Sequence, residues 1–157
     1  MFDFINFSKK ICDSFYINIP DIDVKQKLDT YYLALDNNFM PNNESCEKIA
    51  SNLSNLLQIL KREIQNLNNF NEKLLFPIDF RDEYVGFLII KKYLNNDLII
   101  DYGISTQIQG YSYYPSKFED FDQKTEIDYI EGWNFLISKN DFIININNSI
   151  IICDNYS

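Results

Sequence analysis

Apolar residues recur at spacings of three and four along the first half of the chain, a period typical of amphipathic helices. The first predicted helix ends before Pro20, and its apolar positions are Phe4, Phe7, Ile11 and Phe15. A second helix is predicted from the cap region Asp21 to Asp23 to about Asn37. Its apolar face consists of Val24, Leu28, Tyr31 and Leu35.

A third helix is predicted after Pro41, where Asn43 can cap the first turn. Glu44 and Glu47 lie in that turn, where the positive end of the helix dipole favours acidic side chains. The helix is expected to end at about Asn66. Its apolar stripe consists of Cys46, Ile49, Ala50, Leu53, Leu56, Leu57, Leu60, Ile64 and Leu67. Such a stripe can seat a partner helix, but it usually forms core.

β-Forming residues dominate from position 84 onward. The runs 84–94 and 97–106 are separated by the polar pair Asn95-Asn96, which predicts a β-hairpin. Gly86 and Gly103 interrupt these runs, as expected at bulges or where another group approaches the backbone closely.

Two further strands are predicted at 133–137 and 142–153, with a turn at Lys139-Asn140 between them. Helices grouped before strands indicate an α+β fold, with three N-terminal helices packed on a mostly antiparallel C-terminal sheet of four to five strands. The length of 157 residues suits one domain. We expect its helical part to cover about 1–75 and its sheet part about 80–157.

The net charge of −9 is concentrated in the later part of the chain. Residues 1–96 contain 13 acidic and 11 basic side chains, whereas residues 97–157 contain 10 acidic and three basic ones. Nucleic-acid affinity depends on Lys and Arg displacing condensed counterions, so direct binding to DNA or RNA is not expected. An acidic surface of this kind suits a basic protein partner, although acidity can also serve solubility alone.

Histidine is absent, and the three cysteines, Cys12, Cys46 and Cys153, are far apart. The common zinc sites and the His-based catalytic triads are therefore excluded, and we expect neither a metal ion nor a cofactor. Dispersed cysteines in apolar surroundings predict buried, reduced thiols. No secretion signal is visible, and no apolar run approaches the ~20 residues of a membrane-spanning helix, so a cytoplasmic location away from membranes is expected.

Acidic and aromatic side chains alternate most densely between Lys117 and Trp133. The acidic members are Glu119, Asp120, Asp122, Glu126, Asp128 and Glu131. The aromatic members are Phe118, Phe121, Tyr129 and Trp133, with Tyr111, Tyr113 and Tyr114 shortly before them. If this segment is exposed, it forms a charged, aromatic-anchored binding surface; if it folds under, the aromatic rings are core and only the acids reach solvent.

Two acidic patterns point to metal chemistry, but neither is complete. Asp122-Gln123-Lys124, with Asp101 upstream, resembles the acid-x-Lys magnesium site of a large nuclease superfamily, although so short a triplet is expected by chance. A calcium loop starting at Asp120 is broken by Lys124, because that position needs an oxygen ligand. We therefore predict that the protein is not an enzyme.

The chain as a whole resembles bacterial toxin immunity proteins of the kind encoded beside polymorphic or contact-dependent growth-inhibition toxins. The resemblance rests on the small acidic α+β domain, the missing catalytic set and the acidic-aromatic segment. It implies an inhibitor that binds a basic cognate toxin, frequently a nuclease, and blocks its active site or substrate-binding surface. The implied partner-binding residues are Tyr113, Tyr114, Glu119, Asp120, Phe121, Asp122, Glu126, Asp128, Glu131 and Trp133.

Two other functions stay open at this point. One is a structural or adaptor subunit that uses a sheet edge or the helical stripe for assembly. The other is a divergent magnesium-dependent enzyme that uses Asp101, Asp122 and Lys124.

Overall fold

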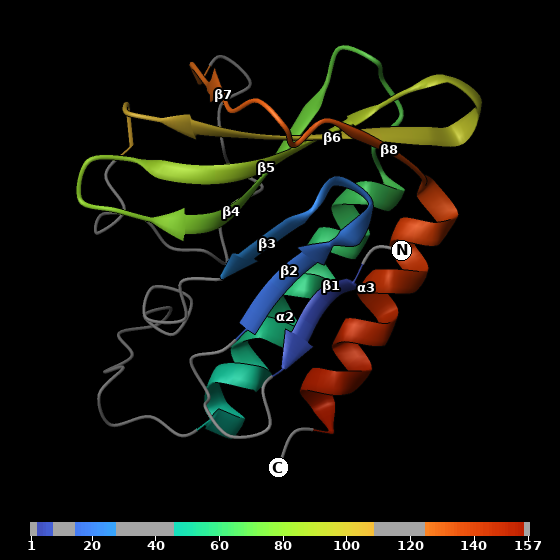
Figure 1. Cartoon of the computed structure of the whole chain (residues 1–157). Helices are drawn as coiled ribbons and strands as arrows, with labels where there is room; N and C mark the ends of the chain where they lie inside the picture. Colours follow the sequence, from blue (N-terminus) through green and yellow to red (C-terminus); the bar gives the residue numbers. More distant parts are fainter. Residues whose placement is uncertain (1–2, 8–14, 28–45, 109–124, 156–157) are drawn as a thin grey trace.

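Two antiparallel sheets and two α-helices make up the described part of the chain in the computed structural model (Figure 1). The structure describes residues 3–7, 15–27, 46–108 and 125–155. The smaller sheet has the strand order β1-β2-β3, with β1 (Asp3–Phe7), β2 (Phe15–Ile19) and β3 (Val24–Lys27). The larger sheet contains β4 (Lys73–Phe80), β5 (Val85–Lys92), β6 (Asp97–Ser105), β7 (Asp128–Tyr129) and β8 (Phe135–Ser138). The helices are α2 (Cys46–Gln65) and α3 (Lys139–Asp154).

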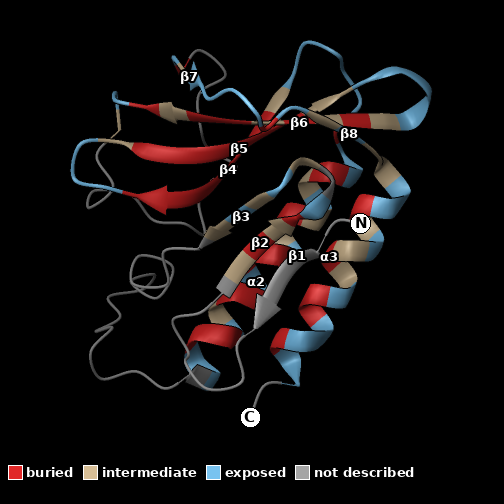
Figure 2. Ribbon diagram, viewed as in Figure 1, coloured by how far each residue is buried: buried red, intermediate tan, exposed pale blue. Residues whose placement is uncertain are grey.

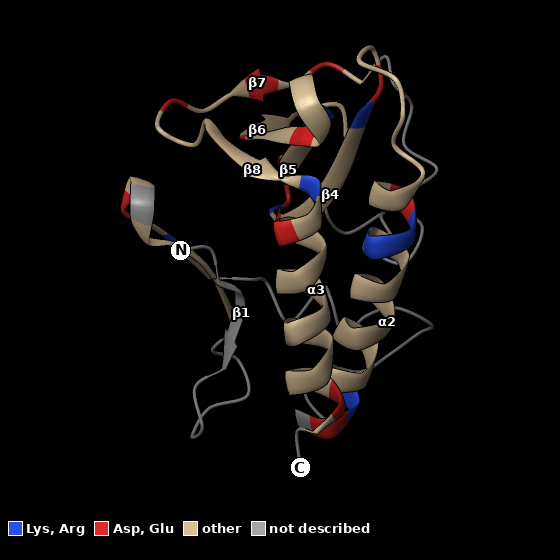
Figure 3. Cartoon of the chain, turned by 90° about the vertical axis from the view of Figure 1, so that its right-hand side faces the viewer, with Lys and Arg blue, Asp and Glu red and all other residues tan. Residues whose placement is uncertain are grey.

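The two helices run side by side, with the larger sheet across one end of the pair and the smaller sheet along one flank (Figures 1 and 3). Buried residues gather on β4, β5 and the facing sides of the helices (Figure 2). Ser54 Oγ of α2 donates a hydrogen bond of 2.6 Å to Asp154 Oδ1, which joins the middle of α2 to the last residue of α3. The α+β class and a mostly antiparallel sheet of five strands are thus confirmed. No helix in the described residues is long and apolar enough to cross a membrane.

The prediction of three N-terminal helices is wrong. Of the apolar positions assigned to the first helix, Phe4 and Phe7 fall on β1 and Phe15 falls on β2, whereas Ile11 lies outside the described residues. The start of the second predicted helix is the short 3-10 turn η1 (Pro20–Ile22), followed by β3. In β2 the side chains of Ile17 and Ile19 are buried while Tyr16 and Asn18 are half-buried, which is the two-residue alternation of a strand. The remainder of the second predicted helix, 28–37, lies outside the described residues.

The third predicted helix is confirmed as α2, whose described residues begin at Cys46 and end at Gln65. All members of its predicted apolar stripe whose side chains are described are buried. The Cys46 side chain and the proposed cap Asn43 lie outside the described set. The stripe packs in the hydrophobic core of the protein.

The predicted strand at 142–153 is wrong, because these residues belong to α3. Ser138 caps the helix: its Oγ accepts a hydrogen bond of 3.0 Å from the backbone N–H of Asp141, and the Asp141 carboxylate lies in the first turn. The buried side chains of α3 follow a helical period, and they are Phe142, Ile146, Ser149, Ile150 and Cys153. Lys139 Nζ donates to the carbonyls of Gln65 and Leu67, at 3.3 Å each, and so ties the start of α3 to the end of α2.

The predicted hairpin is confirmed as β5 and β6, which pair antiparallel along their length. Asn95 and Asn96 make the turn with φ values of 57° and 66°, a conformation that Asn tolerates better than most residues, and the short 3-10 turn η3 (Leu94–Asn96) contains them. Strand β4 pairs with the other edge of β5 and was not predicted. Two strands pair with the other edge of β6. Strand β8 pairs with residues Asp97 to Ile100, and β7 pairs with Gly103 and Ile104.

Candidate partner-binding surface

The described part of the acidic-aromatic segment is 125–133, which leads through β7 towards β8. Glu126, Asp128 and Glu131 are all exposed, and none of them forms an ion pair with another described residue. Figure 3 shows acidic residues along this segment at the top of the molecule. The other predicted partner-binding residues, Tyr113, Tyr114, Glu119, Asp120, Phe121 and Asp122, lie outside the described residues.

Polar contacts from the sheet hold the segment in place. Lys73 Nζ of β4 donates a hydrogen bond of 3.0 Å to the Thr125 carbonyl, and the Glu126 backbone N–H donates to Gln107 Oε1 at 3.1 Å. Further along, the Ile130 N–H donates to the Tyr102 carbonyl at 2.9 Å. The acidic side chains are therefore presented from a backbone that is fixed at several points.

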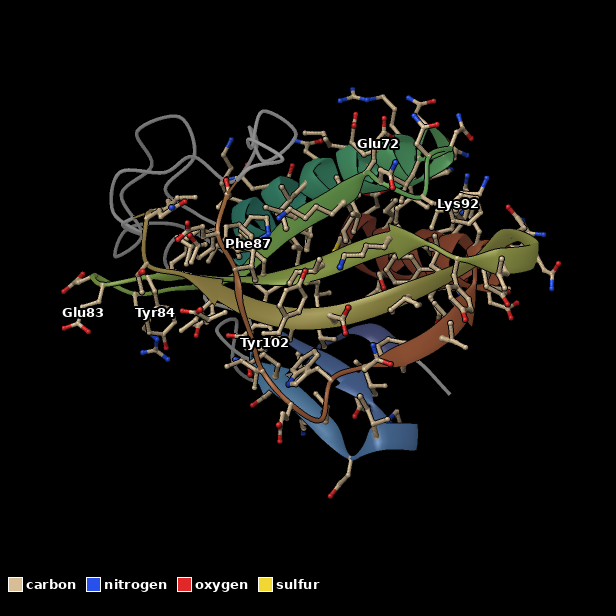
Figure 4. The ribbon with its side chains drawn as sticks, turned by 90° about the horizontal axis from the view of Figure 1, so that it is seen from above. Glu72, Glu83, Tyr84, Phe87, Lys92 and Tyr102 are labelled. Carbon is tan, nitrogen blue, oxygen red and sulfur yellow. The ribbon has the colours of Figure 1, made fainter. Side chains whose placement is uncertain are left out.

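The segment crosses one face of the larger sheet (Figure 4). Gly103 of β6 makes this crossing possible, because a Cβ at this position would overlap Ile127 Cγ2 and approach the Asp128 carbonyl oxygen to 2.9 Å. The expectation that this glycine marks a close approach is confirmed. The approaching group belongs to the acidic segment itself.

Tyr129 lies among the acids and remains 49% exposed. Lys91 Nζ of β5 donates a hydrogen bond of 3.0 Å to the Tyr129 hydroxyl and lies 5.0 Å from the centre of its ring. A cation over an aromatic ring contributes about 0.5–1 kcal/mol at exposed sites, so Lys91 restrains the ring without covering it. The neighbouring Ile130 is also exposed, so apolar and acidic side chains lie together at the surface.

Trp133 belongs to the core and does not project with the acids. Its side chain is buried, and its ring lies 4.8 Å from that of Tyr102, centre to centre, with a tilt of 33°. Burial, followed by the nearby Asp79 carboxylate, raises the pKa of the Tyr102 hydroxyl. Asp79 in turn accepts a 3.1 Å ion-paired hydrogen bond from Arg81 Nε. A Cβ on Gly86 would overlap the Tyr102 hydroxyl, so this glycine lets the phenol lie across β5.

Asp101, one of the residues proposed for magnesium chemistry, accepts a 2.7 Å hydrogen bond from Asn134 Nδ2. The described Cys, Asp and Glu side chains include no group of three that could hold a metal ion. Asp122 and Lys124 lie outside the described residues, so this hypothesis stays a prediction.

The roles of Lys73 and Lys91 were not foreseen from the sequence. Lys73 begins β4 and Lys91 precedes Lys92 at the end of β5, and their contacts join positions that are 52 and 38 residues apart. No local signal reveals such pairings, because they depend on the strand register. Comparison of the chain with models of protein families, with curated proteins and with solved structures finds no match in any of the three.

Proposed function

We propose that this protein binds and neutralises a basic protein toxin, in the manner of an immunity protein, through the acidic segment 125–132. The observation that carries the proposal is that Glu126, Asp128 and Glu131 are exposed on a backbone held by Lys73, Gln107 and Tyr102. Residues ordered before binding lose little conformational entropy when the complex forms, which favours high affinity.

The surrounding charge supports a basic partner. Among the described residues from 97 onward, Lys139 is the one base, and its Nζ is turned towards the end of α2. Lys73 and Lys91 of the larger sheet contact the segment through the Thr125 carbonyl and the Tyr129 hydroxyl. The three exposed carboxylates of the segment outnumber these two bases, which favours encounter with a positively charged surface. If the toxin is a nuclease, these carboxylates engage the Lys and Arg side chains that otherwise bind phosphates.

The test uses the protein encoded directly upstream, because immunity genes lie downstream of their toxin genes. The two purified proteins are expected to form a complex whose affinity falls as salt rises. Changing Glu126, Asp128 and Glu131 together to lysine should weaken that complex by about tenfold or more and remove most of its salt dependence. Affinity is measured by biolayer interferometry at several salt concentrations.

A matched control separates a local contact from a general effect of charge. Glu47, Asp82 and Glu83 are exposed acids that lie away from the segment, and their conversion to lysine changes the net charge equally. The control triple variant is expected to keep most of the affinity. Equal losses in both variants would show that only the overall charge matters. Failure of the wild-type protein to form a complex would refute the proposed function.

An adaptor function is the second candidate, and one observation favours it. Helix α3 exposes three isoleucines, Ile144, Ile151 and Ile152, on a stretch without charged side chains between Asp141 and Asp154. An uncharged apolar helix face of this kind is a common assembly surface. An adaptor would lose its partner when Ile151 is changed to glutamate. It would keep its partner when Glu126, Asp128 and Glu131 are changed to lysine.

A further inference from the structure

The two helices differ on the side that faces solvent. The exposed side chains described on α2 are all polar or charged, and they are Glu47, Lys48, Ser51, Asn55, Gln58, Arg62 and Gln65. Helix α3 instead exposes Ile144, Ile151 and Ile152, which are 55%, 56% and 42% exposed, although its inner side is already apolar and buried. A helix that is apolar on every side is usually covered on every side. The composition of α3 therefore indicates that another surface packs on its outer side.

Helical geometry places the three exposed isoleucines on one face. Ile144, Asn148 and Ile152 follow one another at intervals of four residues, and Ile151 lies beside Ile152. Asn148 is exposed at the centre of this row. We call the set the outer α3 face, and it consists of Asp141, Ile144, Asn148, Ile151, Ile152 and Asn155.

The outer α3 face is uncharged over most of its length. No charged residue lies between Asp141 and Asp154 in the sequence, and the Asp154 carboxylate is turned towards α2, where it accepts the hydrogen bond from Ser54. In Figure 3 the two ends of α3 carry charge colours, the length between them carries none, and no described element crosses in front of it. In a chain with a net charge of −9, two copies can meet at this face without opposing like charges.

We propose that a second copy of this chain occupies the outer α3 face, with the two helices packed antiparallel about a two-fold axis beside Asn148. In such a pair every contact occurs twice, so the face has to complement itself. The antiparallel arrangement places Ile144 of one copy level with Ile151 and Ile152 of the other. The apolar side chains of each copy thus cover those of the other.

The polar ends of the outer α3 face also complement each other in this arrangement. Asp141 of one copy lies level with Asn155 of the other, whose side-chain amide can donate a hydrogen bond to the carboxylate. The two Asp141 carboxylates are about 21 Å apart along the helices, because each helix spans 14 residues from Asp141 to Asn155. This distance exceeds the screening length of about 8 Å at physiological salt, so their repulsion is small.

The antiparallel direction also separates the two acidic segments. The segment 125–132 lies at the end of the molecule where α3 begins (Figure 3). Parallel helices would bring the two acidic segments together, whereas antiparallel helices place them at opposite ends of the pair. The dimer therefore presents two acidic surfaces, and this inference goes beyond the proposed function without resting on it.

The first test is sedimentation equilibrium of the purified wild-type chain alone, from micromolar to millimolar concentration. One helix from each copy forms a smaller contact than the roughly 1,200–2,000 Å² of a standard interface, so the dimer should dissociate on dilution. The mass should rise from that of one 18.7 kDa chain towards that of two as the concentration increases. A chain that remains a monomer throughout the series overturns the proposal without any variant and leaves the proposed function untouched.

Ile144→Lys should weaken the dimer by about tenfold or more, because it places a charge in the apolar contact. The substitution also makes the net charge less negative, so an association governed by overall charge would strengthen instead. Leu136→Lys is the matched control, since Leu136 on β8 is 57% exposed and lies outside the outer α3 face. Lysine favours helices, and circular dichroism checks that the variant folds. If it does not, Ile151→Gln replaces it without changing the net charge.

A mixing experiment tests which positions meet. Ile152→Glu alone should also weaken the dimer, but an equimolar mixture of Ile144→Lys and Ile152→Glu chains should restore it. In the mixed pair the new ammonium and carboxylate groups lie level with each other, and the second such site keeps both isoleucines. Ile144→Lys mixed with Ile144→Glu is the control, because antiparallel packing holds these two positions about 12 Å apart along the helices.

Restored association in the first mixture alone supports the proposal. Restoration in the second mixture, or in neither, overturns the antiparallel pair. Equal weakening by Ile144→Lys and Leu136→Lys would overturn it as well, because the contact would then not depend on the outer α3 face.

Discussion

Gly103 is the position at which one added carbon most directly disturbs the acidic segment. A Cβ here would overlap Ile127 Cγ2, lie 2.9 Å from the Asp128 carbonyl oxygen and lie 3.0 Å from Ile89 Cδ1. Gly103→Ala therefore forces either the acidic segment to lift from β6 or the side chain of Ile89 to move. Overpacking of this kind costs about 1–3 kcal/mol. The lower entropy of the unfolded alanine chain offsets about 0.4–1 kcal/mol of that cost.

We therefore expect Gly103→Ala to lower the free energy of unfolding by about 0.5–2 kcal/mol. At about 2–4 °C per kcal/mol for a protein of this size, the melting temperature should fall by about 1–8 °C. The acidic segment should also lose affinity for the partner, because its backbone no longer rests on the sheet.

A double-mutant cycle identifies the obstructing group. Ile127→Ala removes Cγ2, whereas Ile127→Val retains it, so only the alanine variant makes room for the new carbon. Combining Gly103→Ala with Ile127→Ala should cost about 1 kcal/mol less than the sum of the single changes. The relief is incomplete because the Asp128 carbonyl oxygen stays where it is.

The measurement is urea unfolding followed by the fluorescence of Trp133, the one tryptophan of the chain. If Ile127→Ala and Ile127→Val are both additive with Gly103→Ala, Ile127 does not pack over Gly103. The segment would then follow another path across the sheet, and the argument for a surface fixed before binding would be refuted.

Three other changes test the fold. Ser138→Ala removes the cap of α3 and should cost about 1 kcal/mol in denaturant unfolding, a loss that Ser138→Asp should largely avoid. Trp133→Ala should cost about 3–5 kcal/mol because its ring packs on Tyr102 in the core; unchanged stability would place the indole at the surface. Burial, followed by the neighbouring Asp154 carboxylate, raises the pKa of Cys153 from its ordinary 9.0 to about 12, so the folded protein retains a proton that the unfolded chain loses. Stability should therefore fall between pH 9 and about 12, by up to about 1.4 kcal/mol per pH unit, and more gently in Cys153→Ala; identical slopes would contradict the buried thiol.

The elements that could be predicted are those in which the local sequence pattern favours the same secondary structure that packs in the folded protein. In α2 an apolar stripe continues over five turns, so no strand arrangement accommodates it equally well. The β5–β6 hairpin has β-branched strands and an Asn-Asn turn that tolerates positive φ. In both cases the short-range signal points to the same structure as the packing.

The wrong predictions come from segments in which these signals conflict. Isoleucine dominates 143–152 and favours strands, but a helix places Phe142, Ile146 and Ile150 on one buried face. The Ser138-x-x-Asp141 sequence is a helix-start signal that could have indicated this outcome. At the N-terminus, the spacing of three and four among Phe4, Phe7, Ile11 and Phe15 favours a helix, whereas strand alternation fits β2.

For the candidate surface, the sequence predicted the exposed acids but not what surrounds them. The density of charge made the exposure of Glu126, Asp128 and Glu131 predictable, because isolated buried carboxylates are costly. Which aromatic ring is exposed depends on the path of the chain over the sheet: Tyr129 reaches solvent from β7, whereas Trp133 lies between β7 and β8 and packs on Tyr102. The exposure of Leu136 follows from the strand register and could not be read from its neighbours in sequence.

The packing of α3 against β1 and α2 has a consequence for synthesis on the ribosome. Helix α3 begins about 130 residues after β1 ends, yet it contacts both β1 and α2. While the nascent chain emerges, the apolar side of α2 has no α3 to pack against until residues 139–154 have left the exit tunnel. Closing so long a loop is slow compared with forming local hairpins. The β5–β6 hairpin can therefore form early, whereas the helical pair closes only after α3 has emerged, and α2 is exposed to chaperones until then.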